Sequence, residues 1–323
     1  MIRQFLIVLF LFSLASCSTE EDMASEPAQS NSNLLRYLED HGQTEYFAEA
    51  LALADLPLWQ TDSNYTLLAP VDSALGLFLQ ENGVDSIAQL RTLWGASLFN
   101  QWVGTHLLPV SFRLDEVWPS YLSTLSQNSK GQALHAYLHR EGHHLHCNGR
   151  PVPIAQSDIS VGNDRVHLIQ TVLKPATLRT LIAANYQQLS GLHESLRLTS
   201  NLSVALNDPN EEITVFAPND EGVKAWLNRN QSSGFGQLQS RLGQEAYEEI
   251  LWAHCTRGIL ELGLRNDSTV LGSLRDGGYL TLQQNEGFCR VSADNDFSAR
   301  ILIKNIRGLN GNLHLIDQVL KLP

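Results

Sequence analysis

The sequence predicts an α+β fold that is repeated in two tandem domains. The stretch YTLLAPVD, residues 65–72, returns as ITVFAPND, residues 213–220, at an offset of 148 positions. Within each copy, apolar residues with helical spacing come first, and alternating, turn-rich segments follow. Helices followed by antiparallel strands are the order expected of an α+β domain, and self-similarity at a fixed offset indicates a duplication.

The composition fits two folded domains and argues against a nucleic-acid partner. A chain of 323 residues, with 43% hydrophobic and 17% charged residues, can bury two ordinary cores. The net charge of −12 leaves no basic stripe that could neutralise phosphates. Because the sequence also lacks a P-loop and the common hydrolase and metalloprotease motifs, we expect no enzyme and no cofactor.

The first 32 residues predict export and lipid anchoring. Residues 1–16 combine Arg3 with a short apolar run and end in Leu-Ala-Ser before Cys17, as in a lipoprotein signal peptide whose following cysteine is acylated. A plain secretory signal with a coincidental cysteine is the alternative. Residues 17–32 are polar and predict a flexible tether. We expect a lipid-anchored protein of the bacterial outer membrane, with exposure on the cell surface left open.

Each copy contains a strand that turns into a helix. Residues 65–69 and 213–217 are apolar and favour β-structure, and the proline that follows ends strand pairing. The next polar residues can begin a helix, whose core-facing positions follow at helical spacing. The candidate N-caps are Asp72 or Ser73 in the first copy and Asn219 or Asp220 in the second.

Further landmarks recur and set the domain boundaries. His106 and His254 lie at the ends of matching predicted helices, and His167 and His314 lie in matching closing strands. Asn310-Gly311 between two apolar runs predicts a hairpin turn in the second copy. The expected domains are residues 33–175 and residues 176–323.

These motifs together resemble the fasciclin domain. The resemblance rests on the corner T-x-x-A-P-x-D, the helix-ending histidine and the closing stretch NGNLHLIDQVL, residues 310–320. It implies two wedge-shaped antiparallel β-sandwiches with helices packed alongside, a role in extracellular adhesion or matrix binding, and no catalytic centre. Many members carry Tyr before the helix-ending histidine, whereas Thr105 and Ala253 stand here, so the receptor adhesion of animal relatives does not carry over.

Five residues are candidates for contact with a macromolecule. His106 and His254 could bind near a helix end, although a histidine on an apolar helical face is more often buried and hydrogen-bonded. Trp59, Trp118 and Tyr121 are the aromatic residues that a glycan could stack on, or they could serve in packing.

The stretch LHAYLHREGHHLHCNG, residues 134–149, holds five of the eleven histidines. Around a turn near Glu141-Gly142, alternation predicts a hairpin that brings imidazoles together across two strands. One interpretation is a polar face turned to solvent. The other is a surface site for Zn²⁺, Cu²⁺ or Ni²⁺, with ligands from His135, His139, His144 and His146.

Besides Cys17 the chain has Cys147, Cys255 and Cys289. An odd number leaves at least one thiol unpaired. Cys255 and Cys289 belong to the same copy, which makes them the candidate disulfide within one domain.

The sequence therefore predicts a non-enzymatic adhesion or binding lipoprotein of the cell envelope. Its partner is expected to be an extracellular protein or polysaccharide, and its contact with the membrane is expected through the lipid anchor alone. Two alternatives stay open: a scaffold that faces the periplasm, and a metal-binding protein that uses the histidine-rich hairpin.

Overall fold

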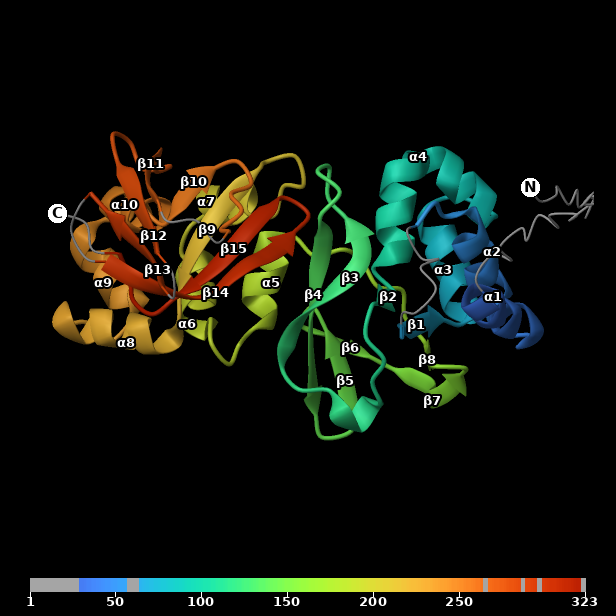
Figure 1. Ribbon diagram of the computed structural model, residues 1–323. Coiled ribbons are helices and arrows are strands. Elements are labelled where there is room, and N and C mark those ends of the chain that lie inside the picture. The colour runs from blue at the N-terminus through green and yellow to red at the C-terminus, as the bar shows by residue number, and fades with distance from the viewer. Residues whose placement is uncertain (1–28, 57–63, 264–266, 286–287, 295–297, 321–323) are drawn as a thin grey trace, which may run out of the picture.

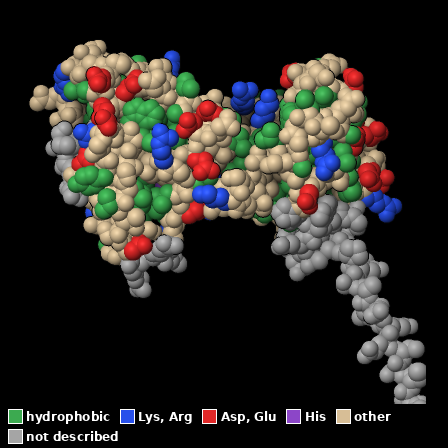
Figure 2. Space-filling view, turned by 90° about the horizontal axis from the view of Figure 1, so that it is seen from above, with side chains coloured by type: hydrophobic (Ala, Val, Ile, Leu, Met, Phe, Trp, Pro, Cys, Tyr) green, Lys and Arg blue, Asp and Glu red, His purple; other side chains and the backbone are tan. Residues whose placement is uncertain are grey.

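The computed structural model describes residues 29–56, 64–263, 267–285, 288–294 and 298–320. Figure 1 shows two lobes side by side, the N-terminal half in blue to green and the C-terminal half in yellow to red. On the face seen in Figure 2, acidic and basic side chains are interspersed over both lobes, and the outline narrows between them.

In the first domain the α-helices come first, interrupted by one strand, and most of the strands follow. Its helices are α1 (Gln29–Asp40), α2 (Glu45–Leu53), α3 (Asp72–Glu81), α4 (Ile87–Gly104) and the short 3₁₀-helix η1 (Leu114–Glu116). Its strands are β1 (Thr66–Pro70), β2 (Leu107–Leu108), β3 (Ser120–Gln127), β4 (Ala133–Glu141), β5 (His144–Cys147), β6 (Arg150–Val152), β7 (Ile154–Val161) and β8 (Asp164–Ile169). Helix α1 starts at Gln29, so the predicted tether is helical over its last four residues.

The second domain repeats this order with small changes. Its helices are α5 (Leu178–Ala184), α6 (Ser190–Arg197), α7 (Asn201–Ala205), α8 (Asp220–Arg229), α9 (Phe235–Leu242) and α10 (Gln244–Trp252). Its strands are β9 (Ile213–Pro218), β10 (Cys255–Arg257), β11 (Asp267–Gly272), β12 (Tyr279–Asn285), β13 (Phe288–Ala293), β14 (Ser298–Gly308) and β15 (Gly311–Ile316).

The sheets confirm the predicted α+β class, but not all of their strand pairs are antiparallel. Among the described residues, the first domain has two sheets, with orders β2-β1-β8-β7 and β3-β4-β5-β6, and the second has one, β10-β9-β15-β14-β13-β12-β11. Most neighbours are antiparallel, as predicted. However, β1 pairs with β8 and β9 pairs with β15 in parallel, because the long intervening chain allows the first and last strands of each copy to run the same way.

The predicted strand-to-helix corner is confirmed in both copies. In the second, Asn219 is the N-cap of α8 and its side chain accepts from the backbone N–H of Gly222 at 2.8 Å. In the first, Val71 occupies the N-cap position and no side chain caps α3. The aspartates one residue later, Asp72 and Asp220, serve other helices: they accept from the first backbone N–H groups of α2 and α6.

The closing hairpin turns one residue earlier than predicted. Gly308 pairs with Gly311, so Leu309 and Asn310 form the turn between β14 and β15. Gly311 has a φ of +146°, and a Cβ there would lie 1.7 Å from the carbonyl oxygen of Ile213. This close approach of β15 to β9 therefore requires glycine.

Candidate functional site

The outer face of the β4–β5 hairpin is where the first domain meets the second. Leu138 and Leu145 are buried in a core cluster of the first domain. Because side chains alternate along a strand, His135, Tyr137 and His139 lie on the opposite face. Strand β4 contacts α5 and β14 of the second domain, and Figure 1 shows β3 and β4 in the middle of the molecule, facing those elements.

One predicted metal ligand, His135, and one predicted binding residue, Tyr121, are used in this domain junction. The backbone N–H of Arg307 donates to Nδ1 of His135 at 3.0 Å, and the hydroxyl of Tyr121 donates to the carbonyl of Leu181 at 3.2 Å. Burial, together with the nearby Arg307 charge, lowers the pKa of His135 to about 4. The hairpin face is thus only partly turned to solvent. The interpretation of this face as a polar surface turned to solvent is therefore wrong where it meets the second domain.

Two of the four predicted metal ligands do come together, joined by a carboxylate. His139 and His146 are cross-strand partners with ring centroids 4.7 Å apart. Glu141 lies on the same face, 3.7 Å from His139 Nε2 and 3.9 Å from His146 Nε2. We call His139, Glu141 and His146 the hairpin triad. His135 contacts the second domain instead, and His144 is exposed and lies outside the triad.

Glu141 was missed because it was assigned to the turn. In the structure β4 continues to Glu141, which pairs with His144. The signal was present in the sequence, since a residue two positions after His139 shares its strand face. The ring of Tyr186, from the second domain, packs edge-on against His139 with centroids 5.2 Å apart.

A groove of about 810 Å³ lies beside this junction. We call it the interdomain groove. The first domain contributes the turn between β5 and β6, and the second domain contributes residues of α5, α6 and α7 and the segment after α7. The lining consists of Asn148, Gly149, Arg150, Arg179, Thr180, Ala183, His193, Ser203, Val204, Asn207, Asp208 and Pro209. Sequence reasoning missed it, because its two walls lie in different domains.

The charged groups of the groove are mainly basic. Arg179 donates to Ser203 Oγ at 3.0 Å and to His193 Nδ1 at 2.8 Å. Burial and the neighbouring Arg197 lower the pKa of Arg179, and burial followed by both arginines lowers the pKa of His193. The one carboxylate in the lining, Asp208, accepts from the backbone N–H of Asn210 in its own turn.

The groove arginines have no acidic partner. Among the described residues, no carboxylate lies within the 4.0 Å ion-pair distance of Arg150 or Arg179. The two guanidinium groups outnumber the one carboxylate of the lining, Asp208, so the groove is positive whereas the whole chain has a net charge of −12.

The repeated helix-ending histidines are buried and fully hydrogen-bonded. His106 Nδ1 lies 3.1 Å from the carbonyl of Trp102, and its Nε2 accepts from the backbone N–H of Leu173 at 3.0 Å. His254 repeats this with Ile250 at 2.8 Å and Leu320 at 2.9 Å. Each ring therefore ties the helix end to the chain that follows the last strand of its domain.

Burial of both imidazole rings explains why their pKa values are lowered. His106 is 0% and His254 3% exposed, and desolvation lowers the pKa of each to about 4. A macromolecule on the surface does not reach them, which counts against the binding role considered from the sequence. The alternative stated from the sequence, a buried and hydrogen-bonded histidine on an apolar helical face, explains the observed hydrogen bonds.

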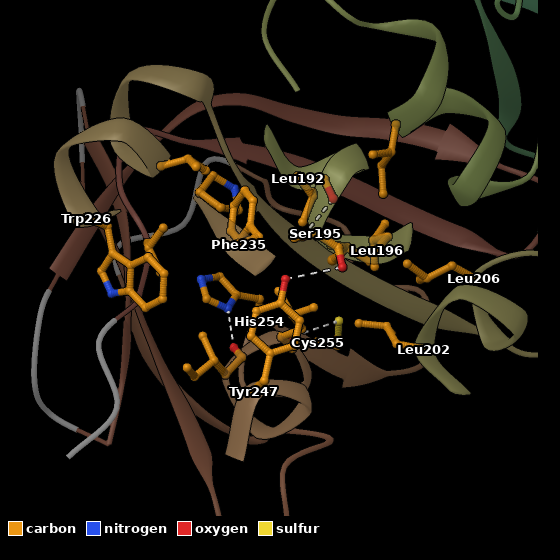
Figure 3. Close-up of a pocket in the computed structure, with 17 residues that line it drawn as sticks. Leu192, Ser195, Leu196, Leu202, Leu206, Trp226, Phe235, Tyr247, His254 and Cys255 are labelled. Carbon is orange, nitrogen blue, oxygen red and sulfur yellow. Dashed lines mark hydrogen bonds between the residues drawn. The ribbon is translucent and has the colours of Figure 1, made fainter. Parts of the chain in front are cut away.

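An apolar cavity next to His254 is too small for a ligand. Figure 3 shows Phe235, Trp226 and Tyr247 around it, with the Tyr247 hydroxyl directed at the carbonyl of Ser195. The cavity volume is about 20 Å³, which is room for about one water molecule. It is a packing gap in the core of the second domain.

The cysteines of the folded domains are free thiols. Cys147, Cys255 and Cys289 are all buried and unpaired. Cys255 and Cys289, the candidate disulfide, belong to different core clusters, so this pairing is not formed. Burial raises the pKa of Cys147 and Cys255 to about 12, which leaves both thiols protonated and unreactive.

Of the three predicted site residues that remain, one is exposed and two lie outside the described residues. Trp118 is 78% exposed, and its side chain is available for contact. Trp59 and Cys17 lie outside the described residues. Within the described ranges, none of the helices has the length and hydrophobicity that a bilayer span needs.

Comparisons with known proteins agree with this architecture. The sequence model of the fasciclin domain matches residues 31–175 and again residues 184–323. Among solved structures, the chain is similar to the FAS1 domain pair of the insect cell adhesion molecule fasciclin I, with 17% identity and a TM-score of 0.49 over 90% of this chain and 97% of that one. A search of curated proteins finds no match.

Proposed function

The chain belongs to the fasciclin domain family, and from this we propose that it is a non-enzymatic envelope lipoprotein that binds an acidic extracellular polysaccharide. Fasciclin domains are associated with adhesion and binding. The observation that carries the proposal is the interdomain groove, which presents arginines without carboxylate partners in a strongly acidic chain.

The groove has the size and the charge for this ligand class. Its volume of about 810 Å³ falls within the roughly 300–1,000 Å³ of typical ligand sites. The planar guanidinium group of arginine matches carboxylate and sulfate groups with two parallel hydrogen bonds. Burial and the contacts with Ser203 and His193 hold Arg179 in place before a ligand arrives, which reduces the entropy lost on binding.

The rest of the lining favours a glycan over an acidic protein. Thr180, Ser203 and Asn207 place hydroxyl and amide groups beside the arginines, and such groups exchange hydrogen bonds with sugar hydroxyls. The groove has no large apolar pocket for the aromatic or aliphatic side chain that usually anchors a protein partner. The exposed side chain of Val204 offers a small apolar surface for the face of a sugar ring.

The N-terminal features support a position at the envelope surface. Acylation at Cys17 would anchor the chain with about 0.8 kcal/mol for each buried methylene, and the polar tether after it would let the domain pair reach outward. A scaffold that faces the periplasm would use the same anchor and the same domains. The side of the outer membrane on which the domains lie therefore distinguishes the proposed binding protein from this scaffold.

Binding of the detergent-solubilised full chain to sulfated and carboxylated polysaccharides, with neutral dextran as reference, tests the proposed ligand. We expect saturable binding to the acidic polymers, at least 10-fold weaker for the double variant Arg150→Gln/Arg179→Gln, because two charge-assisted contacts from the groove lining are lost. Arg91→Gln, on the exposed surface of α4, is the matched control and should bind normally. Equal affinity for dextran, or undiminished binding by the double variant, would overturn the proposal.

A further inference from the structure

The hairpin triad brings three metal-ligating groups to one point, from a single hairpin. His139 and His146 face each other across β4 and β5, and Glu141 follows His139 on the same strand face. One donor atom from each residue lies within 4.8 Å of the other two. The three donors are thus collected by the strand register alone, without any contribution from a mobile loop.

The separations fit a bridging cation better than direct hydrogen bonds. The carboxylate of Glu141 is 3.7 Å from His139 Nε2 and 3.9 Å from His146 Nε2, whereas charge-assisted N–H···O bonds measure about 2.7–2.9 Å. Two tetrahedral ligands at Zn–N and Zn–O distances of about 2.0–2.1 Å lie roughly 3.4 Å apart. Small side-chain movements would bring the triad to that geometry.

The burial of the donors also favours a metal. The side chains of His139 and His146 are 3% and 16% exposed, whereas that of Glu141 is 57% exposed. The exposed side at Glu141 admits the ion from solvent.

We propose that His139, Glu141 and His146 form a three-ligand site for a borderline divalent cation, with Zn²⁺ as the natural occupant and solvent as the fourth ligand. Two imidazoles and one carboxylate suit Zn²⁺, Cu²⁺ and Ni²⁺, whereas Ca²⁺ and Mg²⁺ prefer all-oxygen sites. The site lies beside the domain junction, because Tyr186 of the second domain packs on His139. An ion there would fix the hairpin end against which the second domain rests.

The first test is Zn²⁺ titration of the full chain, purified without a histidine tag and stripped with a chelator. We expect one ion per chain and an affinity at least 10-fold weaker in Glu141→Gln and in His146→Gln. His143→Gln and His144→Gln are the matched controls, since both histidines are exposed on the same hairpin and lie outside the triad. These controls should bind like the wild type.

Circular dichroism and thermal unfolding without metal show whether each variant is folded, so that lost binding is not mistaken for lost structure. X-ray absorption of the zinc-loaded chain should then show two imidazole ligands. No saturable binding to the wild type would overturn the site. Undiminished binding by folded Glu141→Gln and His146→Gln, or an equal loss in the two control variants, would do the same.

Discussion

At the scale of the residue, the fold depends on buried imidazole rings whose hydrogen bonds form only when the ring is neutral. His254 donates to a helix carbonyl with Nδ1 and accepts a backbone N–H with Nε2, and His106 does the same in the first domain. A proton added at Nε2 would place two donors face to face. The duplication has therefore kept a structural bond, which explains why these histidines recur while the hairpin histidines do not.

Replacing His254 with alanine should cost about 2–4 kcal/mol of unfolding free energy. The substitution leaves the buried N–H of Leu320 without its acceptor and also opens a cavity. Urea denaturation followed by circular dichroism measures the change. His143→Ala, on the exposed hairpin turn, is the control and should stay within about 0.5 kcal/mol. A His254→Ala variant as stable as that control would show that the imidazole bonds contribute nothing.

Stability should fall as the pH is lowered from 7 to 5. The pKa values of His106, His254 and His314 are lowered from 6.5 to about 4 in the folded state. Between those values the unfolded chain binds protons that the folded chain does not, so acid favours unfolding by up to ~1.4 kcal/mol per pH unit for each histidine. His254→Gln should show a shallower slope in denaturant titrations at several pH values. An unchanged slope would assign the pH dependence to other groups.

At the scale of the element, the strand-to-helix corner is the part that the sequence predicts best. Apolar β-favouring residues, a proline and helical spacing occur together in a short segment, so local chemistry alone determines the corner. The role of the aspartate that ends the motif was not predicted. Asp220 accepts from the backbone N–H groups of Ser190 and Gly191 at the start of α6, a contact between residues about thirty positions apart that no local pattern indicates.

Asp220→Ala should destabilise the second domain by about 1–2 kcal/mol. The variant removes an acceptor from the unpaired N–H groups at the start of α6 and a negative charge from the positive end of that helix. Thermal or urea unfolding measures the loss. Asp276→Ala, an exposed aspartate in the turn before β12, is the matched control. If both variants lose the same stability, the contact with α6 is not what the motif aspartate provides.

The parallel pairing of the first and last strands of each copy also escaped prediction. Strands β1 and β8 are joined by most of the first domain, and β9 and β15 by most of the second. Alternation shows which residues share a face, but it does not identify the neighbouring strand. The hairpin β14–β15 was predicted because Asn310-Gly311 stands between two apolar runs, although the turn itself lies one residue earlier, at Leu309 and Asn310.

At the scale of the whole molecule, the two domains share a junction that the sequence did not reveal. His135 and His139, which have no counterparts in the second copy, lie on β4, and this strand contacts α5 and β14 of the second domain. That placement depends on how two folded domains pack. The candidate site was therefore predicted only in part: His139 and His146 were named, whereas Glu141 and the interdomain groove were found only in the structure.

Tyr121→Phe should weaken the junction by about 1 kcal/mol. The variant keeps the ring that packs on Tyr137 and loses the hydrogen bond to the carbonyl of Leu181. The loss should appear as a lower unfolding midpoint of the full chain. Tyr46→Phe, at an exposed position on α2, is the control. An equal midpoint for both variants would mean that this bond does not hold the domains together.

The proposed binding of an extracellular polysaccharide requires that the domain pair face outward from the outer membrane. The most direct measurement treats intact cells with a protease that cannot cross the outer membrane and then probes for the folded region after Asn33. The expected result is selective loss of the protein while a periplasmic control stays intact. Full protection, with digestion only after lysis, would contradict it and would place both domains inside the envelope as a scaffold.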